Sequence, residues 1–539
     1  MAETPWWQQK IIYQIYPMSF CDSNGDGIGD LAGIISRLDY LQKLGVGALW
    51  LSPVYPSPNK DNGYDISDYC NIHPNYGTLE QMDTLIAEAK KRDIRIIMDL
   101  VINHTSNQHE WFQKSRRRIA PYTDFYIWRK GENGKKPTNW GNFFGGDCWE
   151  FDEERGEYYL HLFAKEQPDL NYHNEAVIEA IENVMRFWLD RGVAGFRCDV
   201  INIIYKEAIK NGKWRPALTG SEYYLSTPGC HRVLHRLYTD VLSQYNAFTV
   251  GETVFVTPKM ADDLVNPARG ELSTVFAFEH METDCYKIKW FLRRFNPDRF
   301  FACLTKWQQA LPWNTVYLEN HDQPRSVSRY GNDTKYHDES AKALATLVLT
   351  LRGTPFLYEG QEIGMTNFDF PDMQKVRDVE SINIWNIGKR LHLPRSLRWR
   401  MIKTKSRDNA RTPMQWNDSP NAGFTTGTPW LSVNGNYPRI NAARQENDPA
   451  SVLSFYRRLI AFRNGSEVLQ AGSFTRLFLG NGVYAYRREL NGEGLTVVVS
   501  LAAAERPNPV SGTVVLSNYD RTEAPQRLAP YEALILQEE

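Results

Sequence analysis

The sequence predicts an α/β protein: a (β/α)8 barrel of the TIM type, with a subdomain inserted after strand 3 and a C-terminal antiparallel β domain. Eight short apolar runs rich in β-branched residues alternate with segments of helical periodicity. Runs that are apolar throughout are typical of strands buried on both faces, and repeated strand–helix alternation is typical of a parallel barrel. Two stretches break this alternation, and they supply the inserted subdomain and the C-terminal domain.

The eight candidate strands follow one another from the N-terminus to about residue 360. We expect them at 11–20, 46–52, 94–102, 193–200, 247–253, 273–279, 314–320 and 354–360.

Helical patterns lie between several of these strands. Residues 31–45 place leucines and isoleucines on one face, and Gly45 is suited to end that helix. Residues 78–93 open with a Thr-x-x-Gln capping box. The helical period recurs at 175–192 and at 451–464.

The two interruptions set the expected domain boundaries. Residues 104–174, rich in Trp, Gly and Asn, stand where a short connection is expected, so we predict an inserted subdomain there. The catalytic barrel then comprises 1–103 and 175–470. Residues 471–539 show short β patterns punctuated by Gly, Asn and Pro, which predict an antiparallel β domain.

Composition narrows the class of function. The chain has 539 residues, a formal net charge of −2 and 23% charged residues, so no basic excess indicates a nucleic-acid or anionic-membrane partner. The N-terminal segment lacks a basic stretch followed by an apolar run, and no uninterrupted apolar run is long enough to span a membrane, so we expect neither a signal peptide nor a transmembrane helix.

The seven cysteines are scattered and form no CxxC pair, which favours reduced thiols in a cytoplasmic protein over a zinc site. No organic cofactor is indicated. We expect a monomer or a weak oligomer.

Four polar motifs follow the apolar runs and carry the chemistry. They read DLVINH (99–104), GFRCDV (195–200), TVGET (249–253) and ENHD (319–322). In a parallel barrel the strand ends at one face converge on one pocket. The three acids Asp199, Glu252 and Asp322 are therefore expected together, and such a cluster favours glycosidic bond hydrolysis.

With these motifs in this order, the chain resembles the α-amylase superfamily, glycoside hydrolase family 13. Within it, the oligo-1,6-glucosidase, dextran glucosidase and α-glucosidase group is the nearest in pattern. The segments IYQIYPMSF and SRDNARTPMQW (406–416) add support at group level. The resemblance covers essentially the whole chain.

The resemblance assigns roles to the acids. Asp199 matches the nucleophile, Glu252 the general acid/base, and Asp322 the third acid that stabilises the oxocarbenium-like state. Arg197, two residues before Asp199 on the same strand face, is expected to keep that carboxylate ionised.

The resemblance also implies a substrate site. His104 and His321 match the histidines that bond the terminal sugar, Asp61 and Tyr64 close that subsite, and Arg411 faces it. For Phe144 and Phe163, stacking on the sugar and packing in the core or a lid remain alternatives. Gln167 is a weaker candidate for the same site.

The loop DSNGDGIGD (22–30) is a candidate metal site. The side chains of Asp22, Asn24, Asp26 and Asp30 and the carbonyl of Ile28 supply hard oxygen donors, as in the first nine positions of an EF-hand loop. The acid of the twelfth position is missing, so the loop is not a complete EF-hand. The resemblance implies structural Ca²⁺, or Mg²⁺, and the alternative is a solvated turn.

Val200, directly after the nucleophile, bears on specificity. A valine there resembles α-1,6-specific members, so we expect a retaining exo-acting α-glucosidase acting on isomaltose, isomalto-oligosaccharides and panose. A trehalose-6-phosphate hydrolase and a sucrose-active transglucosylase or isomerase remain alternatives. A non-catalytic partner protein is disfavoured by the intact acids.

Overall fold

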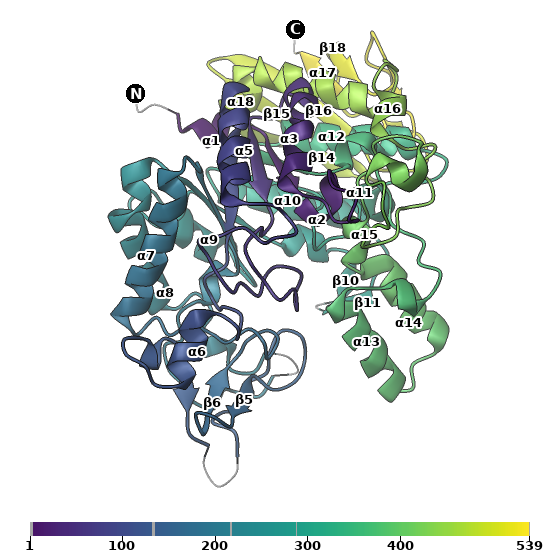
Figure 1. Ribbon diagram of the computed structural model, residues 1–539. Helices are drawn as coiled ribbons and strands as arrows, with labels where there is room; N and C mark the ends of the chain where they lie inside the picture. The colour runs from purple at the N-terminus through teal and green to yellow at the C-terminus, as the bar shows by residue number, and fades with distance from the viewer. Residues whose placement is uncertain (1–3, 132–134, 216–217, 287, 538–539) are drawn as a thin grey trace. The chain divides into compact units, whose positions relative to one another are not determined.

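The structure is a computed structural model that describes residues 4–131, 135–215, 218–286 and 288–537 (Figure 1). It contains two compact units. Unit 1 comprises 1–49, 88–94 and 279–539, and unit 2 comprises 50–87 and 95–278.

Eight strands form one sheet, and each lies within one of the predicted apolar runs. The first and eighth of these strands in chain order pair in parallel, with Ile12 opposite Phe356, which is the pairing that closes a barrel. The predicted (β/α)8 barrel is thereby confirmed. In sheet order the strands are β12 (Thr315–Val316), β13 (Thr354–Tyr358), β1 (Ile12–Ile15), β2 (Ala48–Leu51), β3 (Arg95–Leu100), β7 (Gly195–Cys198), β8 (Phe248–Glu252) and β9 (Thr274–Phe276).

The N-terminal region differs from the prediction in two places. The strand expected at 11–20 ends at Ile15, and α2 (Pro17–Phe20) follows, because proline at the first helical position is preorganised for a helix. The helix expected at 31–45 is divided at Arg37, whose φ of −108° and ψ of 5° separate α3 (Leu31–Ser36) from α4 (Leu38–Leu44). Gly45 ends α4 in the left-handed region, as predicted.

The capping box of α5 (Leu79–Lys91) forms in both directions. The backbone N–H of Thr78 donates to Gln81 Oε1 at 3.0 Å, and the N–H of Gln81 donates to Thr78 Oγ1 at 3.3 Å. The sequence motif therefore marks the true start of this helix.

Unit 2 contains the helices that flank its barrel strands and a small antiparallel sheet. Figure 1 shows α6 beside strands β5 and β6 of that sheet. The helices are α6 (Glu110–Arg116), α7 (Glu175–Asp190), α8 (Pro228–Asp240) and α9 (Pro258–Val265), and the sheet order is β4 (Trp128–Arg129), β6 (Glu157–Leu160), β5 (Trp149–Asp152).

Unit 1 contains most of the remaining helices and a hairpin. Helices α13 and α14 pack together, and α14 contacts the hairpin of β10 (Cys285–Tyr286) and β11 (Ile288–Leu292) (Figure 1). The helices are α1 (Trp6–Gln9), α10 (Pro297–Ala310), α11 (Ser326–Tyr330), α12 (His337–Thr350), α13 (Val379–Arg390), α14 (Arg395–Lys405), α15 (Asp408–Arg411), α16 (Ala442–Gln445), α17 (Val452–Asn464) and α18 (Glu467–Ala471).

An antiparallel sheet ends the chain, also within unit 1. Its inward face buries aliphatic side chains that include Val483, Val498 and Leu534. Its order is β14 (Ser473–Gly480), β15 (Val483–Leu490), β16 (Glu493–Ser500), β20 (Ala533–Gln537), β18 (Thr513–Ser517), with a separate pair of β17 (Arg506–Pro507) and β19 (Arg527–Leu528).

All seven cysteines are free thiols. Among the described residues, no helix is both long and apolar enough to cross a bilayer.

Candidate active site

A single buried guanidinium organises the carboxylates of unit 2. Arg197 Nη1 donates to Asp99 Oδ1 and to Asp199 Oδ1, each at 2.7 Å, and Nη2 donates to Glu252. Asp99 lies on β3 opposite Arg197 on β7, and Glu252 ends the adjacent parallel strand β8. Three neighbouring strands thus deliver three acids to one cation, and the predicted residues Arg197, Asp199 and Glu252 meet.

The electrostatics of this cluster favour retention of a proton. Burial raises the pKa of Asp199 well above its usual value, and the charges of Glu252 and Asp99 raise it further, whereas Arg197 lowers it. Burial also raises the pKa of Asp99 to about 6, against the opposing effect of Arg197. Arg197 acts on Asp199 in the expected direction but does not outweigh burial. Protons of coupled groups belong to the whole cluster, so burial favours a proton shared among its carboxylates over three separate negative charges.

Asp99 was not among the predicted site residues. Asp99 is the first residue of the DLVINH motif, and its fully buried side chain forms an ion pair with Arg197. Its position in that motif was the available signal, but its partner could only be identified once the strands were paired.

A second group in unit 2 surrounds His104. His104 Nε2 lies 3.1 Å from the carbonyl oxygen of Tyr64 and 3.1 Å from Gln167 Nε2, which lies 3.3 Å from Asp61 Oδ2. The Tyr64 hydroxyl donates to Asp99 Oδ2 at 3.2 Å and so joins this group to the carboxylate cluster. Burial lowers the pKa of His104 to about 4, so its ring is neutral at pH 7.

Aromatic side chains cover His104. The Phe163 ring centroid lies 5.1 Å from that of His104, and Phe144 meets Phe163 edge-on at 5.7 Å. Phe163 also packs against the hydrophobic cluster that contains Val200. Val200 is 6% exposed and has a φ of 37°, an unusual conformation for a β-branched residue.

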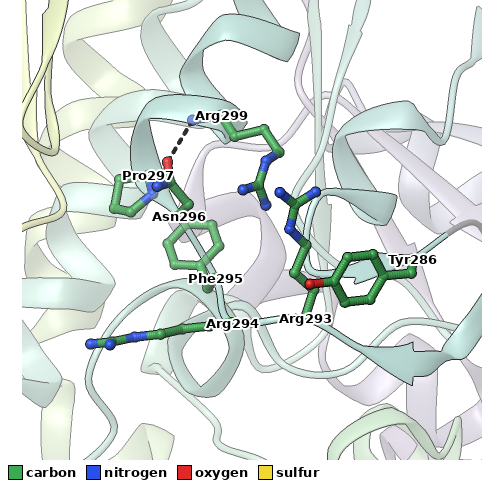
Figure 2. A pocket seen from close by; sticks show the side chains of 7 residues that line it. All are labelled: Tyr286, Arg293, Arg294, Phe295, Asn296, Pro297 and Arg299. Carbon is green, nitrogen blue, oxygen red and sulfur yellow. Dashed lines mark hydrogen bonds between the residues drawn. The ribbon is translucent and has the colours of Figure 1, made fainter.

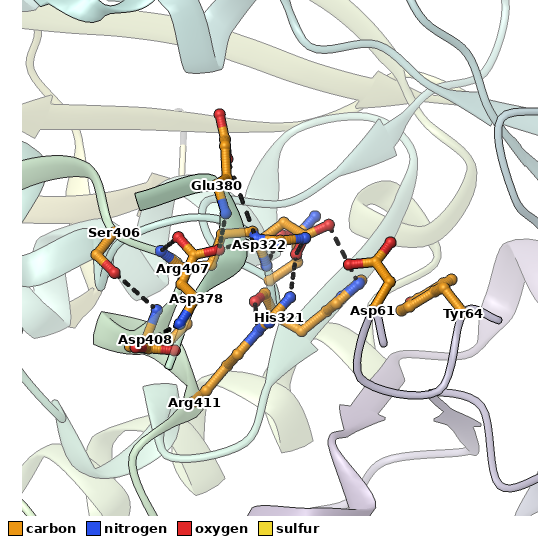
Figure 3. Close-up of polar contacts among 12 residues, drawn as sticks. Asp61, Tyr64, His321, Asp322, Asp378, Glu380, Ser406, Arg407, Asp408 and Arg411 are labelled. Atoms are coloured by element: carbon orange, nitrogen blue, oxygen red, sulfur yellow. Dashed lines mark hydrogen bonds and ion pairs between the residues drawn. The ribbon is translucent and has the colours of Figure 1, made fainter. Parts of the chain in front are cut away.

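The remaining predicted sugar-site residues belong to unit 1. Arg411 Nε donates to the carbonyl oxygen of His321 at 2.9 Å, and Arg411 Nη2 donates to Asp322 Oδ1 at 2.6 Å (Figure 3). His321 Nε2 lies 3.3 Å from Asp322 Oδ2. Burial raises the pKa of Asp322, but His321, Arg407 and Arg411 lower it more strongly, so the net pKa is well below its usual value. Asp322 is therefore an ionised carboxylate, and its side chain is 30% exposed.

A buried network behind Asp322 was not predicted. Arg407 lies 3.5 Å from Asp322 Oδ1, and its Nε donates to Asp378 Oδ1 at 2.8 Å (Figure 3). Asp378 is the N-cap of α13, and Lys289 of the hairpin pairs with Glu380 on the first turn of that helix at 2.7 Å. Arg407 stands in the same segment, 406–416, as Arg411, but no local pattern in the sequence indicates its distant partner Asp378.

The candidate metal loop is a series of hydrogen-bonded turns in unit 1. Asp22 Oδ1 accepts from the backbone N–H of Asn24 and Gly25, and Asp30 Oδ1 accepts from Gly33 and thereby caps α3. Among the described residues, no cluster of three or more His, Cys, Asp or Glu side chains is placed to bind a metal. The loop also offers the amide oxygen of Asn24 and the carbonyl oxygen of Ile28, and Asp26 Oδ1 accepts one hydrogen bond and keeps a second lone pair.

A surface pocket lies beside the hairpin in unit 1 and contains none of the predicted site residues. Figure 2 shows its lining, in which Arg299 donates its backbone N–H to Asn296 Oδ1. The lining residues are Tyr286, Arg293, Arg294, Phe295, Asn296, Pro297 and Arg299. Its three arginines make it a cationic surface.

Comparison with known proteins gives concordant results. The model of the α-amylase catalytic domain matches residues 14–472. An oligo-1,6-glucosidase of Parageobacillus thermoglucosidasius is 47% identical, with 99% of each chain covered. The trehalose-6-phosphate hydrolase of Bacillus licheniformis has a similar structure, with a TM-score of 0.94, 42% identity and 99% of each chain covered. The trehalulose synthase of Pseudomonas mesoacidophila also matches, with a TM-score of 0.95, 40% identity, and 99% of this chain and 100% of that chain covered.

Proposed function

The chain belongs to the α-amylase family of glycoside hydrolases, and from this premise we propose that it is a retaining, exo-acting α-glucosidase. Its substrates are short α-glucosides, with α-1,6 linkages preferred, and its product is α-glucose. The observation that carries the proposal is the sharing of one guanidinium by Asp199 and Glu252 at the ends of adjacent strands.

The reaction proceeds in two displacements. An Asp199 oxygen attacks the anomeric carbon while Glu252 donates a proton to the departing glycosidic oxygen, and a covalent glucosyl–enzyme ester forms. Glu252 then takes a proton from water, whose oxygen attacks the same carbon and releases the enzyme ester. Asp322 is proposed as the third acid, because an ionised carboxylate stabilises positive charge that develops on the sugar ring.

The stereochemistry of the product tests this mechanism. Carboxyl groups that act by retention are separated by about 5–5.5 Å, and contact of both with one guanidinium favours such a short separation. The first glucose released from isomaltose, observed by NMR before mutarotation, is expected to be the α-anomer. Initial release of β-glucose contradicts the proposal.

The linkage preference rests on the oligo-1,6-glucosidase relative and on Val200. The test is kcat/KM for isomaltose, panose, maltose, sucrose and trehalose 6-phosphate, measured side by side. Isomaltose and panose are expected to be the best substrates. A clear preference for maltose contradicts the linkage proposal while leaving retention intact.

A second candidate is a hydrolase of trehalose 6-phosphate, which the similar Bacillus licheniformis structure favours. Under this candidate, kcat/KM for trehalose 6-phosphate exceeds that for isomaltose in the substrate panel. A sucrose-active isomerase is the third possibility, supported by the trehalulose synthase structure, and sucrose in the panel tests it.

We propose that the 22–30 loop binds Ca²⁺, or Mg²⁺ in its place, through Asp22, Asn24, Asp26, Asp30 and the Ile28 carbonyl. The support is the all-oxygen donor set on a closely turned loop. Chelation is expected to lower the melting temperature more than it alters turnover, because an ion that binds only the folded state stabilises it. Asp26→Asn should abolish the Ca²⁺-dependent rise in melting temperature, and a structure in millimolar Ca²⁺ with water in the loop contradicts the proposal.

We also propose that the protein acts in the cytoplasm as a monomer or weak oligomer, with a small sugar as its only obligate partner. The free thiols support a reducing compartment. Cell fractionation and sedimentation velocity test the two parts separately.

A further inference from the structure

A buried lysine of unit 2 lies two hydrogen bonds away from His104. The side chain of Lys206 is fully buried, and its Nζ lies 2.6 Å from Asp169 Oδ2 and 2.7 Å from Asn103 Oδ1. Asn103 Nδ2 in turn lies 3.1 Å from His104 Nδ1. Lys206, Asn103 and His104 therefore form a continuous chain of polar contacts.

The chemistry of these groups dictates the direction of each hydrogen bond. An ammonium group has donors and no acceptor, so Asn103 must turn its carbonyl oxygen toward Lys206. Its NH₂ group then faces His104 and donates to Nδ1. A ring nitrogen that accepts a hydrogen bond carries no proton, and because the ring is neutral, the proton of His104 resides on Nε2.

The contacts of Nε2 include a donor that would also suit the opposite tautomer, in which the proton lies on Nδ1. The backbone N–H of Ala164 donates to Gln167 Oε1 at 3.0 Å, which turns the Gln167 NH₂ group toward His104 Nε2 at 3.1 Å. If Nε2 lacked its proton, it would accept from Gln167 and could no longer donate. The carbonyl oxygen of Tyr64 also lies 3.1 Å from Nε2, so the orientation of Asn103 and the Tyr64 carbonyl both favour an Nε2–H that donates over a bare Nε2 that accepts from Gln167.

We infer that Lys206 is a positioning residue that acts through Asn103 to fix His104 as the Nε2–H tautomer, which donates to the Tyr64 carbonyl oxygen and so holds Tyr64 in the predicted sugar site. The link from this contact to sugar binding rests on the proposed α-glucosidase function. The tautomer itself does not, because it follows from contacts within the protein alone.

The decisive variant is Asn103→Asp, which preserves shape but replaces the NH₂ donor with an acceptor. A carboxylate can accept from Lys206 with one oxygen and from His104 Nδ1–H with the other, so the tautomer should switch to Nδ1–H. The probe is ¹⁵N NMR of histidine-labelled enzyme, in which the two ring nitrogens report their protonation directly. The His104 signals are identified by their loss in His104→Gln.

Kinetics report whether the tautomer matters for the sugar. Asn103→Asp is expected to raise the KM for isomaltose about tenfold or more, with a smaller change in kcat. The double variant Lys206→Met with Asp169→Asn removes the buried ion pair without leaving a lone charge, and it should give a mixture of tautomers. Lys405→Met removes another buried lysine, which pairs with Asp284 at 2.7 Å in unit 1, and should leave the His104 signals unchanged.

Each result decides one part. Wild-type His104 with its proton on Nδ1, or Asn103→Asp with the proton still on Nε2, overturns the inference. A switched tautomer with unaltered KM overturns the sugar-binding part alone. An enzyme without α-glucosidase activity contradicts the proposed function, while the tautomer measured in the free protein still stands or falls by itself.

Discussion

At the scale of single residues, Arg197 determines which charges unit 2 can tolerate. Its guanidinium contacts Asp99, Asp199 and Glu252, so three acids share one buried cation. Removing any one acid changes the charge balance for the other two. Substitutions at Asp199 and Glu252 should therefore be as close to isosteric as possible.

The two catalytic acids are expected to respond differently to neutralisation. Asp199→Asn should abolish turnover of every glucoside, because no carboxylate remains to form the ester. Glu252→Gln should lose isomaltose hydrolysis by a factor of about 10²–10⁴, yet retain more activity on aryl glucosides, whose leaving groups need little protonation. The measurement is kcat/KM for both substrates. An equal loss on both would assign Glu252 another role.

Val200 is expected to influence linkage choice through the cluster in which it is buried. Because that cluster also supports Phe163, Val200→Ala should loosen the wall beside His104 and raise the ratio of maltose to isomaltose kcat/KM by up to about tenfold, or 1.4 kcal/mol. Val200→Thr keeps the branched shape but adds a hydroxyl group. Comparing the two variants therefore distinguishes an effect of side-chain polarity from an effect of side-chain volume. An unchanged ratio in both variants would place the determinant elsewhere.

Residues that follow apolar runs could be predicted, whereas their buried partners could not. Asp199 and Glu252 were identifiable because each ends a strand-like run within a recognisable motif. Asp99 and Lys206 act through contacts with residues 98 and 103 positions away, respectively, and such contacts depend on strand pairing. No local pattern in the sequence specifies those partners.

At the scale of elements, the N-terminus of α13 connects a helix cap to the site around Asp322. Asp378 accepts from the backbone N–H groups of Glu380 and Ser381 and also pairs with Arg407. One carboxylate thus both starts a helix and neutralises a guanidinium next to Asp322. A substitution that weakens this helix cap is therefore expected also to disturb the position of Arg407 beside Asp322.

Asp378→Asn tests this coupling. It removes the buried carboxylate that pairs with the Arg407 guanidinium and should lower the free energy of unfolding by about 3 kcal/mol, with a loss of kcat/KM. Asp372→Asn is the matched control, because Asp372 caps the short 3-10 helix Met373–Lys375 at an exposed position and should cost less than about 1 kcal/mol. Urea denaturation and isomaltose kinetics give both quantities. Equal effects of the two substitutions would contradict the coupling.

Element boundaries followed local signals where these were strong. The capping box at Thr78 and the glycine at 45 mark true helix ends. The break at Arg37 interrupts a continuous apolar stripe, and the strand from residue 11 stops before Pro17 although its apolar character continues. Periodicity reports which face is buried and does not reveal where the backbone turns.

At the scale of the whole molecule, buried neutral histidines make stability depend on pH. Burial lowers the pKa of His104 and of His280 from 6.5 to about 4. The unfolded chain therefore binds protons that the folded chain excludes, so stability is lost as pH falls from about 6.5 to 4. Carboxyl groups with a raised pKa, such as Asp99, have the opposite effect: the folded chain binds their proton more readily, so they increase stability as pH falls over the lower part of this range.

Comparing the pH dependence of the unfolding free energy between a variant and the wild type isolates the contribution of one histidine. His280→Gln should remove up to about 3 kcal/mol of the loss between pH 6.5 and 4, the value of a shift of about 2.5 pK units. His392→Gln is the control, because it removes a histidine whose side chain is exposed rather than buried. Unfolding free energies from urea titrations at several pH values give the slopes. Parallel curves for wild type and His280→Gln would exclude this histidine as a source.

The pairing of β1 with β13 also delays completion of the barrel until late in synthesis of the chain. β1 ends at Ile15 and β13 begins at Thr354, so the edge of β1 has no partner on that side until most of the chain has left the ribosome. At about 5–20 residues per second, the wait is on the order of tens of seconds. During that time an apolar strand edge is exposed to other nascent chains. Expression at lower temperature or with added chaperone capacity should therefore increase the yield of folded enzyme more than any change to its surface.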